Sequence, residues 1–252
     1  MTFDGQDVLV TGGSRGIGRA TAKLFAEHGA TVVVQYRSDE RAAAATLAAL
    51  APGAHRAMQA DLSDAAEARA LVERVIAERG HVDVLVNNAG VYEAHPVLAT
   101  SPEEWQEQWR RTIGTNLLGP ANLIHAVVPH MLRAGGGRIV NVSSRGAFRG
   151  EPDHAAYGAS KAGLNSLGQS MAQALAPHGI YVTTVAPGFV ETDMAAPYLA
   201  GPAGEAIRAQ SPLNRAATPE EVARVIVFLA SPGSESATGA IVDVNGASYL
   251  RT

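Results

Sequence analysis

A hydroxyl, a phenol and an ammonium group lie within one short stretch, residues 144–161, and together could transfer a proton. Tyr157 and Lys161 are four residues apart, so on a helix they would share one face. We expect the ammonium to lie near the phenol and to lower its pKa from about 10 toward working pH. Such a phenol can act as a general acid or base. Ser144, upstream of the tyrosine, adds a hydrogen-bonding hydroxyl.

The lysine at position 161 supports this functional interpretation. The chain has 20 Lys and Arg residues, of which only Lys23 and Lys161 are lysines. Arginine would bring a planar fork that stays charged, whereas the compact ammonium of lysine can approach a phenol and join a proton path. The alternative, an ordinary surface tyrosine beside a solvated lysine, stays open on this spacing alone.

The elements that would position these groups follow a repeated strand and helix pattern. Short apolar runs predict seven strands, at residues 7–10, 31–36, 55–60, 82–86, 138–142, 181–185 and 240–244. Helical patterns separate them, including residues 64–79 and 219–229. The pattern predicts an α/β fold: a single doubly wound (Rossmann) domain with a seven-stranded parallel sheet and helices on both faces. No linker or shift in composition divides residues 1–252.

Composition limits the function classes. With 46% hydrophobic and 17% charged residues, the chain can bury a substantial core. A net charge of -4 gives no electrostatic reason to expect binding to nucleic acid or to an anionic membrane. The absence of cysteine excludes disulfides and thiolate chemistry. The first residues lack a signal-peptide pattern and no apolar run reaches the length of a membrane span, so we expect a cytoplasmic protein.

A glycine-rich turn directly after the first predicted strand indicates a dinucleotide site. Gly12 permits a tight turn, Gly16 lets the backbone approach a pyrophosphate, and Gly18 lets helix and strand pack closely. The start of the following helix attracts the anion. The absence of a following Gly-Lys-Ser/Thr argues against a triphosphate-binding loop. We expect the turn to contribute Gly12, Ser14, Arg15, Gly16, Ile17 and Gly18 to cofactor binding.

The end of the second predicted strand indicates which dinucleotide binds. An NAD-selective site usually carries an acidic side chain here, about twenty residues past the glycine turn. This chain has Tyr36, followed by Arg37 and Ser38, which can bond a 2′-phosphate, and Arg15 can approach from the turn. We therefore predict a preference for NADP(H). The alternative is that Arg37 is one more solvated arginine.

Together with further motifs, these features resemble the short-chain dehydrogenase/reductase family, in particular its β-ketoacyl-carrier-protein reductase-like members. The resemblance covers nearly the whole chain. Its motifs occur in order as the glycine turn, Asn-Asn-Ala-Gly at 87–90, Asn116, Ser144, Tyr157-x-x-x-Lys161 and Pro187-Gly188. The resemblance implies a doubly wound sheet that binds a nicotinamide dinucleotide.

Residue roles follow from the resemblance. It makes Tyr157 the proton donor to a carbonyl, Ser144 the partner of the substrate oxygen, Lys161 the ligand of the nicotinamide ribose, and Asn116 the support of a water path to Lys161. Ser144 is preferred over the adjacent Ser143 because of its spacing to the tyrosine. The alternatives are Asn116 as a helix cap and Ser144 as a turn hydroxyl. For the cofactor it adds Asp61, Leu62, Asn88, Ala89, Gly90, Pro187, Gly188, Val190 and Thr192, although Asp61 could equally cap the following helix.

Some features depart from the family pattern. The segment before Asn116 is a few residues longer than usual, so we expect the helix there to begin differently. Basic residues that would dock a carrier protein are represented only by Arg133, which weakens a carrier-protein substrate. The eight His residues show no His-Glu-x-x-His spacing, so we expect no catalytic metal. We expect residues 91–98, 145–153 and 195–211 to set the substrate shape.

The sequence thus predicts an NADP-dependent oxidoreductase that interconverts a carbonyl and a secondary alcohol. A β-ketoacyl thioester, a small ketone, a sugar or a cyclic alcohol could be its substrate. The alternative from another class is a dinucleotide-binding sensor or scaffold on the same fold. The family resemblance also implies a homotetramer, which would cover the edge at the last strand.

Overall fold

The computed structural model describes residues 1–251 and contains one seven-stranded parallel sheet with the strand order β3-β2-β1-β4-β5-β6-β7. This confirms the predicted fold class. The order reverses direction between β1 and β4, which is where open parallel sheets form ligand crevices. The strands are β1 Asp7–Val10, β2 Thr31–Tyr36, β3 Arg56–Gln59, β4 Val84–Asn87, β5 Gly137–Val142, β6 Ile180–Pro187 and β7 Ile241–Val244.

The sheet is buried on both faces because alternate residues of each inner strand enter two separate cores. Val8 and Val10 of β1 pack into one core, and Leu9 packs into the other. In the same way, Val32 and Val34 of β2 pack into the first core, and Val33 packs into the second. Burial on both sides explains why these strands appear in the sequence as continuous apolar runs.

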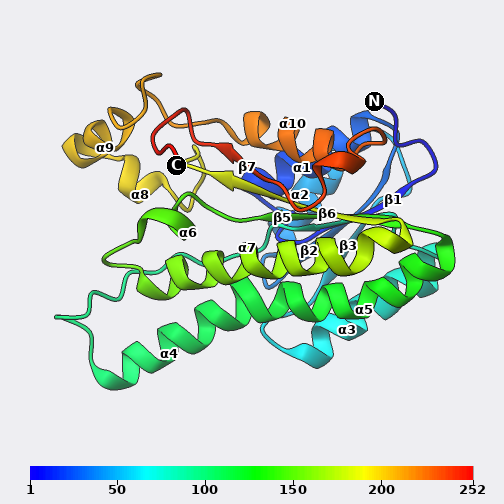
Figure 1. The fold of residues 1–252 in the computed structure, drawn as a ribbon, viewed down its shortest axis with the longest axis horizontal. Coiled ribbons are helices and arrows are strands. Elements are labelled where there is room, and N and C mark those ends of the chain that lie inside the picture. The colour runs from blue at the N-terminus through cyan, green and yellow to red at the C-terminus, as the bar shows by residue number, and fades with distance from the viewer. Residues whose placement is uncertain (252) are drawn as a thin grey trace.

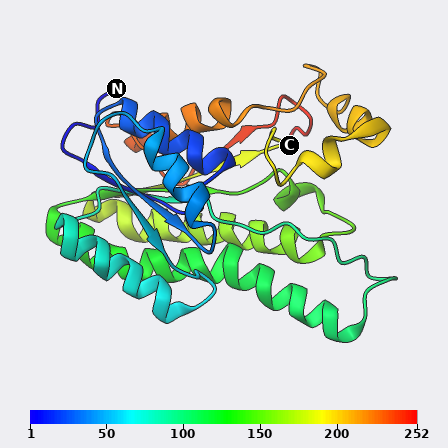
Figure 2. The ribbon, with the colours of Figure 1, turned by 180° about the vertical axis from the view of Figure 1, so that it is seen from behind.

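The helices form two layers (Figure 1). On one face lie α1 Gly16–Glu27, α2 Glu40–Ala48 and α10 Pro219–Leu229; on the other lie α3 Ala65–Arg79, α5 Gly119–Ala134 and α7 Ala155–Leu175. The view from behind shows the same separation (Figure 2). The helix α4 Pro102–Ile113 precedes α5, and the short helices α6 Gly146–Arg149, α8 Ala196–Leu199 and α9 Gly201–Arg208 lie together at one end.

A π-helical turn, Gly114–Leu118, joins α4 to α5 and contains Asn116. Each π turn holds more residues than an α turn, and such turns often occur at functional sites. Asn116 is fully buried within this turn. The expectation that the helix begins differently from the family pattern stays a prediction.

Local signals set the predicted helix boundaries. Thr218 caps α10 and Glu221 completes a capping box, as the sequence of that segment predicts. Asp64 caps α3 and Gly80 ends it with a φ of 87°. The predicted strands differ from the observed ones by two residues or fewer at most ends, and none of the described helices is long and apolar enough to cross a membrane.

Candidate active site

The predicted catalytic and cofactor residues gather at the carboxyl edge of the sheet. The glycine turn follows β1, Ser144 follows β5, and Pro187 ends β6. Because all seven strands are parallel, these three ends lie at the same edge. The helix α7 carries Tyr157 and Lys161 along this edge, and α6 and α8 lie beside it (Figure 1).

Tyr157 and Lys161 share one face of α7, as their spacing predicts. The Lys161 ammonium lies 5.7 Å from the centre of the Tyr157 ring and donates a hydrogen bond of 2.8 Å to the carbonyl of Val142. Ser144 lies against the phenol and forms a hydrogen bond with it. The Ser144 oxygen also accepts the amide N–H of Gly146 at 3.0 Å. The three groups therefore meet at one point.

The prediction that Lys161 lowers the phenol pKa is wrong for this structure. Burial raises the pKa of Tyr157 to about 12, with the hydrogen bond from Ser144 lowering it and the Glu151 carboxylate raising it further. Burial also lowers the pKa of Lys161 to about 8. The ammonium donates to the Val142 carbonyl and lies over the Tyr157 ring, and desolvation is the largest influence on the phenol pKa.

Ser143 and Ser144 have different surroundings. Ser143 is buried and its hydroxyl donates to the backbone carbonyl of Lys161 at 3.2 Å. Ser144 is only half-buried and faces the phenol. The geometry therefore agrees with the choice of Ser144 from the sequence, and it gives Ser143 the task of attaching β5 to α7.

The Asn116 side chain is fully occupied inside the protein. Its oxygen accepts the amide N–H of Val91 at 2.9 Å, and its nitrogen donates to the Val91 carbonyl at 3.0 Å and to the Ser160 hydroxyl at 3.1 Å. A Cβ built on Gly90 would lie 3.3 Å from Asn116 Oδ1 and 3.6 Å from Lys161 Nζ. Asn116 thus fixes the segment after β4 beside Lys161; both of its amide N–H groups are used and its oxygen keeps one acceptor position, so its support of a water path to Lys161 stays a prediction.

The glycine turn has the geometry of a phosphate cradle. Gly12 and Gly16 have φ angles of +59° and +52°, which residues with a side chain rarely adopt. A Cβ on Gly18 would lie 2.3 Å from the Gly12 carbonyl oxygen, so only glycine allows α1 to begin this close to β1. Ser14 is held by its carbonyl, which accepts the Thr46 hydroxyl at 3.0 Å.

The start of α1 fits an anion. Its first position, Arg15, makes no side-chain cap, and no acidic residue lies in the first turn, which includes Ile17. By contrast, α2, α3, α4 and α10 each begin with a capping side chain and an acidic first turn. The N–H groups at the start of α1 therefore stay available for a pyrophosphate. The residues present fit the dinucleotide that the turn predicts.

Gln35, which the sequence analysis missed, fixes this turn. Its side-chain oxygen accepts the Gly12 N–H at 2.9 Å and its nitrogen donates to the Ala60 carbonyl at 2.8 Å. Gln35 is buried in the β2 run Thr-Val-Val-Val-Gln-Tyr. A single amide within a buried apolar strand was the signal that could have identified it.

Asn88 closes the crevice between β1 and β4. Its amide donates to the carbonyls of Thr11 and Gly12 at 2.9 and 3.2 Å, while the Thr11 hydroxyl accepts the N–H groups of Asn88 and Ala89. A Cβ on Gly12 would lie 2.9 Å from Ala89 Cα. The Asn88 side chain therefore binds the glycine turn itself, and Ala89 lies directly against it.

The second-strand residues lie at the carboxyl end of β2, the strand next to β1 in the sheet. Tyr36 ends β2, and both Arg37 and Ser38 are exposed just beyond it, as is Arg15. The Arg37 guanidinium is close enough to Asp61 to contribute to lowering the pKa of that carboxyl, although the hydrogen bond from Ser63 contributes more. These positive charges stand free at the surface of the predicted cofactor site.

Asp61 and Leu62 follow β3. Asp61 Oδ1 accepts the N–H and the hydroxyl of Ser63 at 2.9 and 2.6 Å, and the residue that caps α3 is Asp64, so the alternative that Asp61 caps this helix is wrong. Leu62 is buried, and its carbonyl lies 2.8 Å from a Cβ built on Gly119. The structure places both residues at the carboxyl edge, with Leu62 inside the core.

The residues after β6 border the site from the other side. Gly188 donates its N–H to the Val244 carbonyl at 3.1 Å, which attaches the end of β6 to β7 beyond Pro187. Val190 is buried and pairs with Ala217 in an isolated bridge. A Cβ on Gly16 would lie 3.0 Å from Thr192 Cγ2, so Thr192 faces the glycine turn across the crevice.

Comparisons with known proteins agree with this geometry. Residues 12–247 match the family model described as "Enoyl-(Acyl carrier protein) reductase". A protein of Staphylococcus aureus named 3-oxoacyl-[acyl-carrier-protein] reductase FabG is 40% identical over 247 residues, which cover 97% of this chain and 98% of that protein. The chain belongs to the short-chain dehydrogenase/reductase family.

Solved structures of relatives have the same fold. A short chain dehydrogenase from Burkholderia cenocepacia in complex with NADP has a TM-score of 0.87 and 32% identity, covering 98% of this chain and 99% of that one. A putative NAD(P) dependent gluconate 5-dehydrogenase from Beutenbergia cavernae, with bound NADP at low occupancy, has a TM-score of 0.87 and 35% identity, covering 97% of both.

In this short-chain dehydrogenase/reductase, an aromatic cluster, formed by Tyr92, His154 and Tyr198, adjoins Tyr157. Tyr92 stacks parallel on His154, with ring centres 3.8 Å apart, and its edge meets Tyr157 at 4.7 Å. The Tyr198 hydroxyl lies 2.9 Å from His154 Nε2. Tyr92 and Tyr198 lie in the segments 91–98 and 195–211 that the sequence predicts to shape the substrate, but no local sequence pattern joins the three rings.

Arg145, a buried arginine, connects the segment after Ser144 with two later parts of the chain. Arg145 follows Ser144 and donates to the Ser248 hydroxyl at 2.6 Å and to the Gln210 side-chain oxygen at 2.8 Å. Arg149 reaches the same Gln210 oxygen at 3.2 Å. These bonds join α6 to the last residues of the chain and to the segment after α9.

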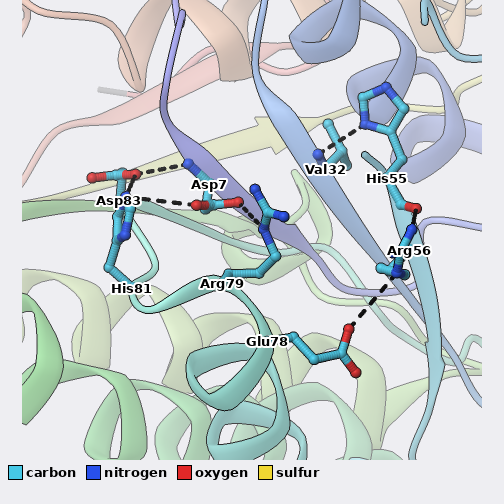
Figure 3. Close-up of polar contacts among 8 residues, drawn as sticks. All are labelled: Asp7, Val32, His55, Arg56, Glu78, Arg79, His81 and Asp83. Atoms are coloured by element: carbon cyan, nitrogen blue, oxygen red, sulfur yellow. Dashed lines mark hydrogen bonds and ion pairs between the residues drawn. The ribbon is translucent and has the colours of Figure 1, made fainter. Parts of the chain in front are cut away.

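One group among residues 1–251 has carboxylate and imidazole atoms close enough to hold a metal ion, namely Asp7, His81 and Asp83 (Figure 3). It lies at the amino end of β1, the edge opposite Tyr157. Asp7 Oδ1 already accepts the Arg79 guanidinium at 2.6 Å, and Asp83 Oδ2 accepts the Asp7 amide N–H at 2.7 Å. A guanidinium in contact with the carboxylate opposes a cation there, so the group serves as an ion-pair network.

Proposed function

We propose that this protein interconverts a ketone and a secondary alcohol with NADP(H) as cofactor, using Tyr157 as the general acid and base. The observation that carries the proposal is the meeting of Ser144, Tyr157 and Lys161 at the carboxyl edge, directly beside an uncapped glycine-rich turn. A sensor needs only the turn, whereas this group has the composition of a proton-transfer site.

The residues divide the chemical work. Ser144 accepts the Gly146 N–H, and its own hydrogen, which lies beside the Tyr157 phenol, can turn to a substrate oxygen placed there. Tyr157, with a pKa of about 12, holds its proton at neutral pH and can give it to an oxygen that gains negative charge. Both donors act more strongly on the developing oxyanion than on the ketone, so they stabilise the transition state in preference to the substrate.

Lys161 replaces the proton that Tyr157 gives away. With a pKa of about 8, its ammonium gives up a proton more readily than an ordinary lysine. Asn116 holds the Val91 segment against Lys161 and so maintains the position of the ammonium. A bound nicotinamide dinucleotide supplies or accepts the hydride.

The proposed cofactor contacts are those given by the sequence. The start of α1 would hold the pyrophosphate, and the exposed Arg37, Ser38 and Arg15 would bind the 2′-phosphate of NADP. The NADP seen in the Burkholderia cenocepacia and Beutenbergia cavernae proteins supports this choice.

We also propose a cytoplasmic homotetramer, with α5, α7, α10 and the β7 edge as the contact regions. Three exposed apolar side chains on or next to these helices support it: Leu118, Leu132 and Phe228.

The proposal is tested by following NADPH oxidation in the presence of a panel of simple ketones, hydroxylated ketones, β-ketoacyl thioesters and sugars, with NADH in parallel. We expect turnover of at least one ketone class and faster turnover with NADPH. Tight NADPH binding without oxidation by any member of the panel would contradict the enzymatic function and favour the sensor.

A further inference from the structure

A carboxylate that the proposed mechanism does not use lies beside the catalytic serine. Glu151 is in the loop between α6 and α7, and its side chain turns back over the start of α6. A Cβ built on Gly146 would lie 2.8 Å from Glu151 Oε1 and 2.9 Å from its Cγ. Gly146 in turn donates its N–H to the Ser144 hydroxyl. Gly146 therefore lies between the Glu151 carboxylate and the Ser144 hydroxyl, which would bind the reacting oxygen.

The Glu151 carboxylate is oriented by the aromatic cluster. The Tyr92 hydroxyl forms a hydrogen bond with it, and Tyr92 is held by stacking on His154 and by its edge contact with Tyr157. The negative charge of Glu151 contributes to raising the pKa of both Tyr92 and Tyr157, which places it near both phenols. The carboxylate thus lies against Gly146 and near the phenols of Tyr92 and Tyr157.

Glu151 has bonding capacity left over. A carboxylate offers about four acceptor positions, and Tyr92 uses one. None of the ion pairs within residues 1–251 involves Glu151, even though it is half-buried and burial raises its pKa. A partly desolvated carboxylate without an ion-pair partner is stabilised by any ligand that donates hydrogen bonds to it.

The charges around Glu151 indicate which donor fits. The guanidinium groups of Arg145 and Arg149 are close enough to lower its pKa, so the local sum of these three charges is positive. An ammonium ligand would be repelled by the two arginines, whereas a neutral hydroxyl would not. The neighbouring rings of Tyr92, His154 and Tyr198 carry polar tips, which suit a substrate with both C–H and O–H groups.

We infer that Glu151 is a specificity-determining residue that accepts a hydrogen bond from a substrate hydroxyl close to the reacting carbon. Hydroxylated ketones and the corresponding diols or polyols are then the preferred substrates, ahead of plain ketones and β-ketoacyl thioesters. This inference rests on the proposed function and specifies its substrate class.

The test compares matched substrates in matched variants. The values of kcat/KM with NADPH are measured for acetoin against butanone and for hydroxyacetone against acetone. The hydroxyl also changes the intrinsic reactivity of the ketone, so the decisive quantity is the change in this ratio on mutation. We expect Glu151→Gln to lower the ratio about tenfold or more, because a charge-assisted hydrogen bond becomes a neutral one. Tyr92→Phe, which frees the carboxylate, should lower it less.

The control is Asp153→Asn, an equal change of charge at an exposed carboxylate in the same loop, which should leave the ratio unchanged. Circular dichroism and thermal melting confirm that each variant is folded. An unchanged ratio in Glu151→Gln overturns the inference, and so does an equal fall in kcat/KM for both members of a pair, which would show a structural role. Turnover of plain ketones with no effect of Glu151 leaves the proposed function intact; failure to reduce any ketone overturns both.

Discussion

The two edges of the sheet use polar groups in opposite ways. At the amino edge, the network formed by Asp7, Arg79, His81 and Asp83 pairs its charges with one another (Figure 3). At the carboxyl edge, the start of α1 has no cap, and Glu151 forms no ion pair among the described residues. Groups satisfied internally stabilise the fold, whereas groups left with bonding capacity are those that can hold a ligand.

A second ion pair at the amino edge shows the same contrast with the carboxyl edge. Arg138, near the start of β5, pairs with Glu235 at 2.6 Å, and the Asp83 carbonyl accepts the Arg138 N–H at 2.8 Å. On the carboxyl edge, Lys161 is buried and Tyr157 is half-buried, and the pKa values of both are shifted toward their neutral forms. The ion pairs of Asp7 and Arg138 thus lie at the edge opposite Tyr157 and Lys161.

The largest effect is expected for Tyr157→Phe, which removes the proton donor but keeps the ring. Turnover should fall by about two to four orders of magnitude, the usual contribution of acid–base catalysis, while NADPH binding by fluorescence titration stays nearly the same. Tyr181→Phe is the matched control, because Tyr181 lies near the amino end of β6 beside Arg138. Full activity in Tyr157→Phe would refute the role of Tyr157 as the proton donor at the carboxyl edge.

Arg79→Ala tests the amino edge. The Asp7 carboxylate is only 4% exposed and would lose its guanidinium partner, so the free energy of unfolding should fall by about 2 to 4 kcal/mol. Urea denaturation measures the loss, and kcat of the folded fraction should be unchanged. Arg69→Ala breaks an exposed pair with Glu73 and should cost less than about 1 kcal/mol. Equal losses in the two variants would show that the amino-edge network is not specially stabilising.

Lys161→Met should stabilise the protein while abolishing efficient turnover. A pKa lowered from 10.5 to about 8 means that the folded state disfavours the ammonium by about 3 kcal/mol below pH 8. Losing the hydrogen bond to Val142 offsets about 1 kcal/mol, which leaves a gain of about 2.

The sign of this effect depends on pH. Between pH 8 and 10.5 the unfolded chain binds more protons at this lysine than the folded protein, so the parent gains stability as pH rises and the advantage of the variant disappears. Denaturation curves at pH 7 and pH 10 measure the difference. A variant that is less stable than the parent at pH 7 would contradict the desolvation argument.

The smallest effect is expected for Arg37→Ala, which should reduce the preference for NADPH over NADH about tenfold by removing one charge-assisted bond to the 2′-phosphate. The ratio of kcat/KM for the two cofactors measures it. Arg41→Ala, at an exposed position in α2, is the control. A parent enzyme that prefers NADH would show that Arg37, just after β2, does not bind the 2′-phosphate.

Much of the fold was fixed by local signals. The buried runs gave the strands, because both faces of the sheet are covered and each strand is apolar throughout. The glycine turn was readable because its φ angles and close contacts exclude side chains. Tyr157 and Lys161 were readable as a pair because a helix brings residues four apart onto one face.

Only the tertiary structure decided how these groups are surrounded. The sign of the Tyr157 pKa shift depends on burial by distant segments, which outweighs the local charge of Lys161. The aromatic cluster joins Tyr92, His154 and Tyr198 from three separate segments, and Glu151 reaches Gly146 only because its loop folds back. Sequence spacing encodes which residues share an element, whereas desolvation and contacts between elements arise when the chain packs.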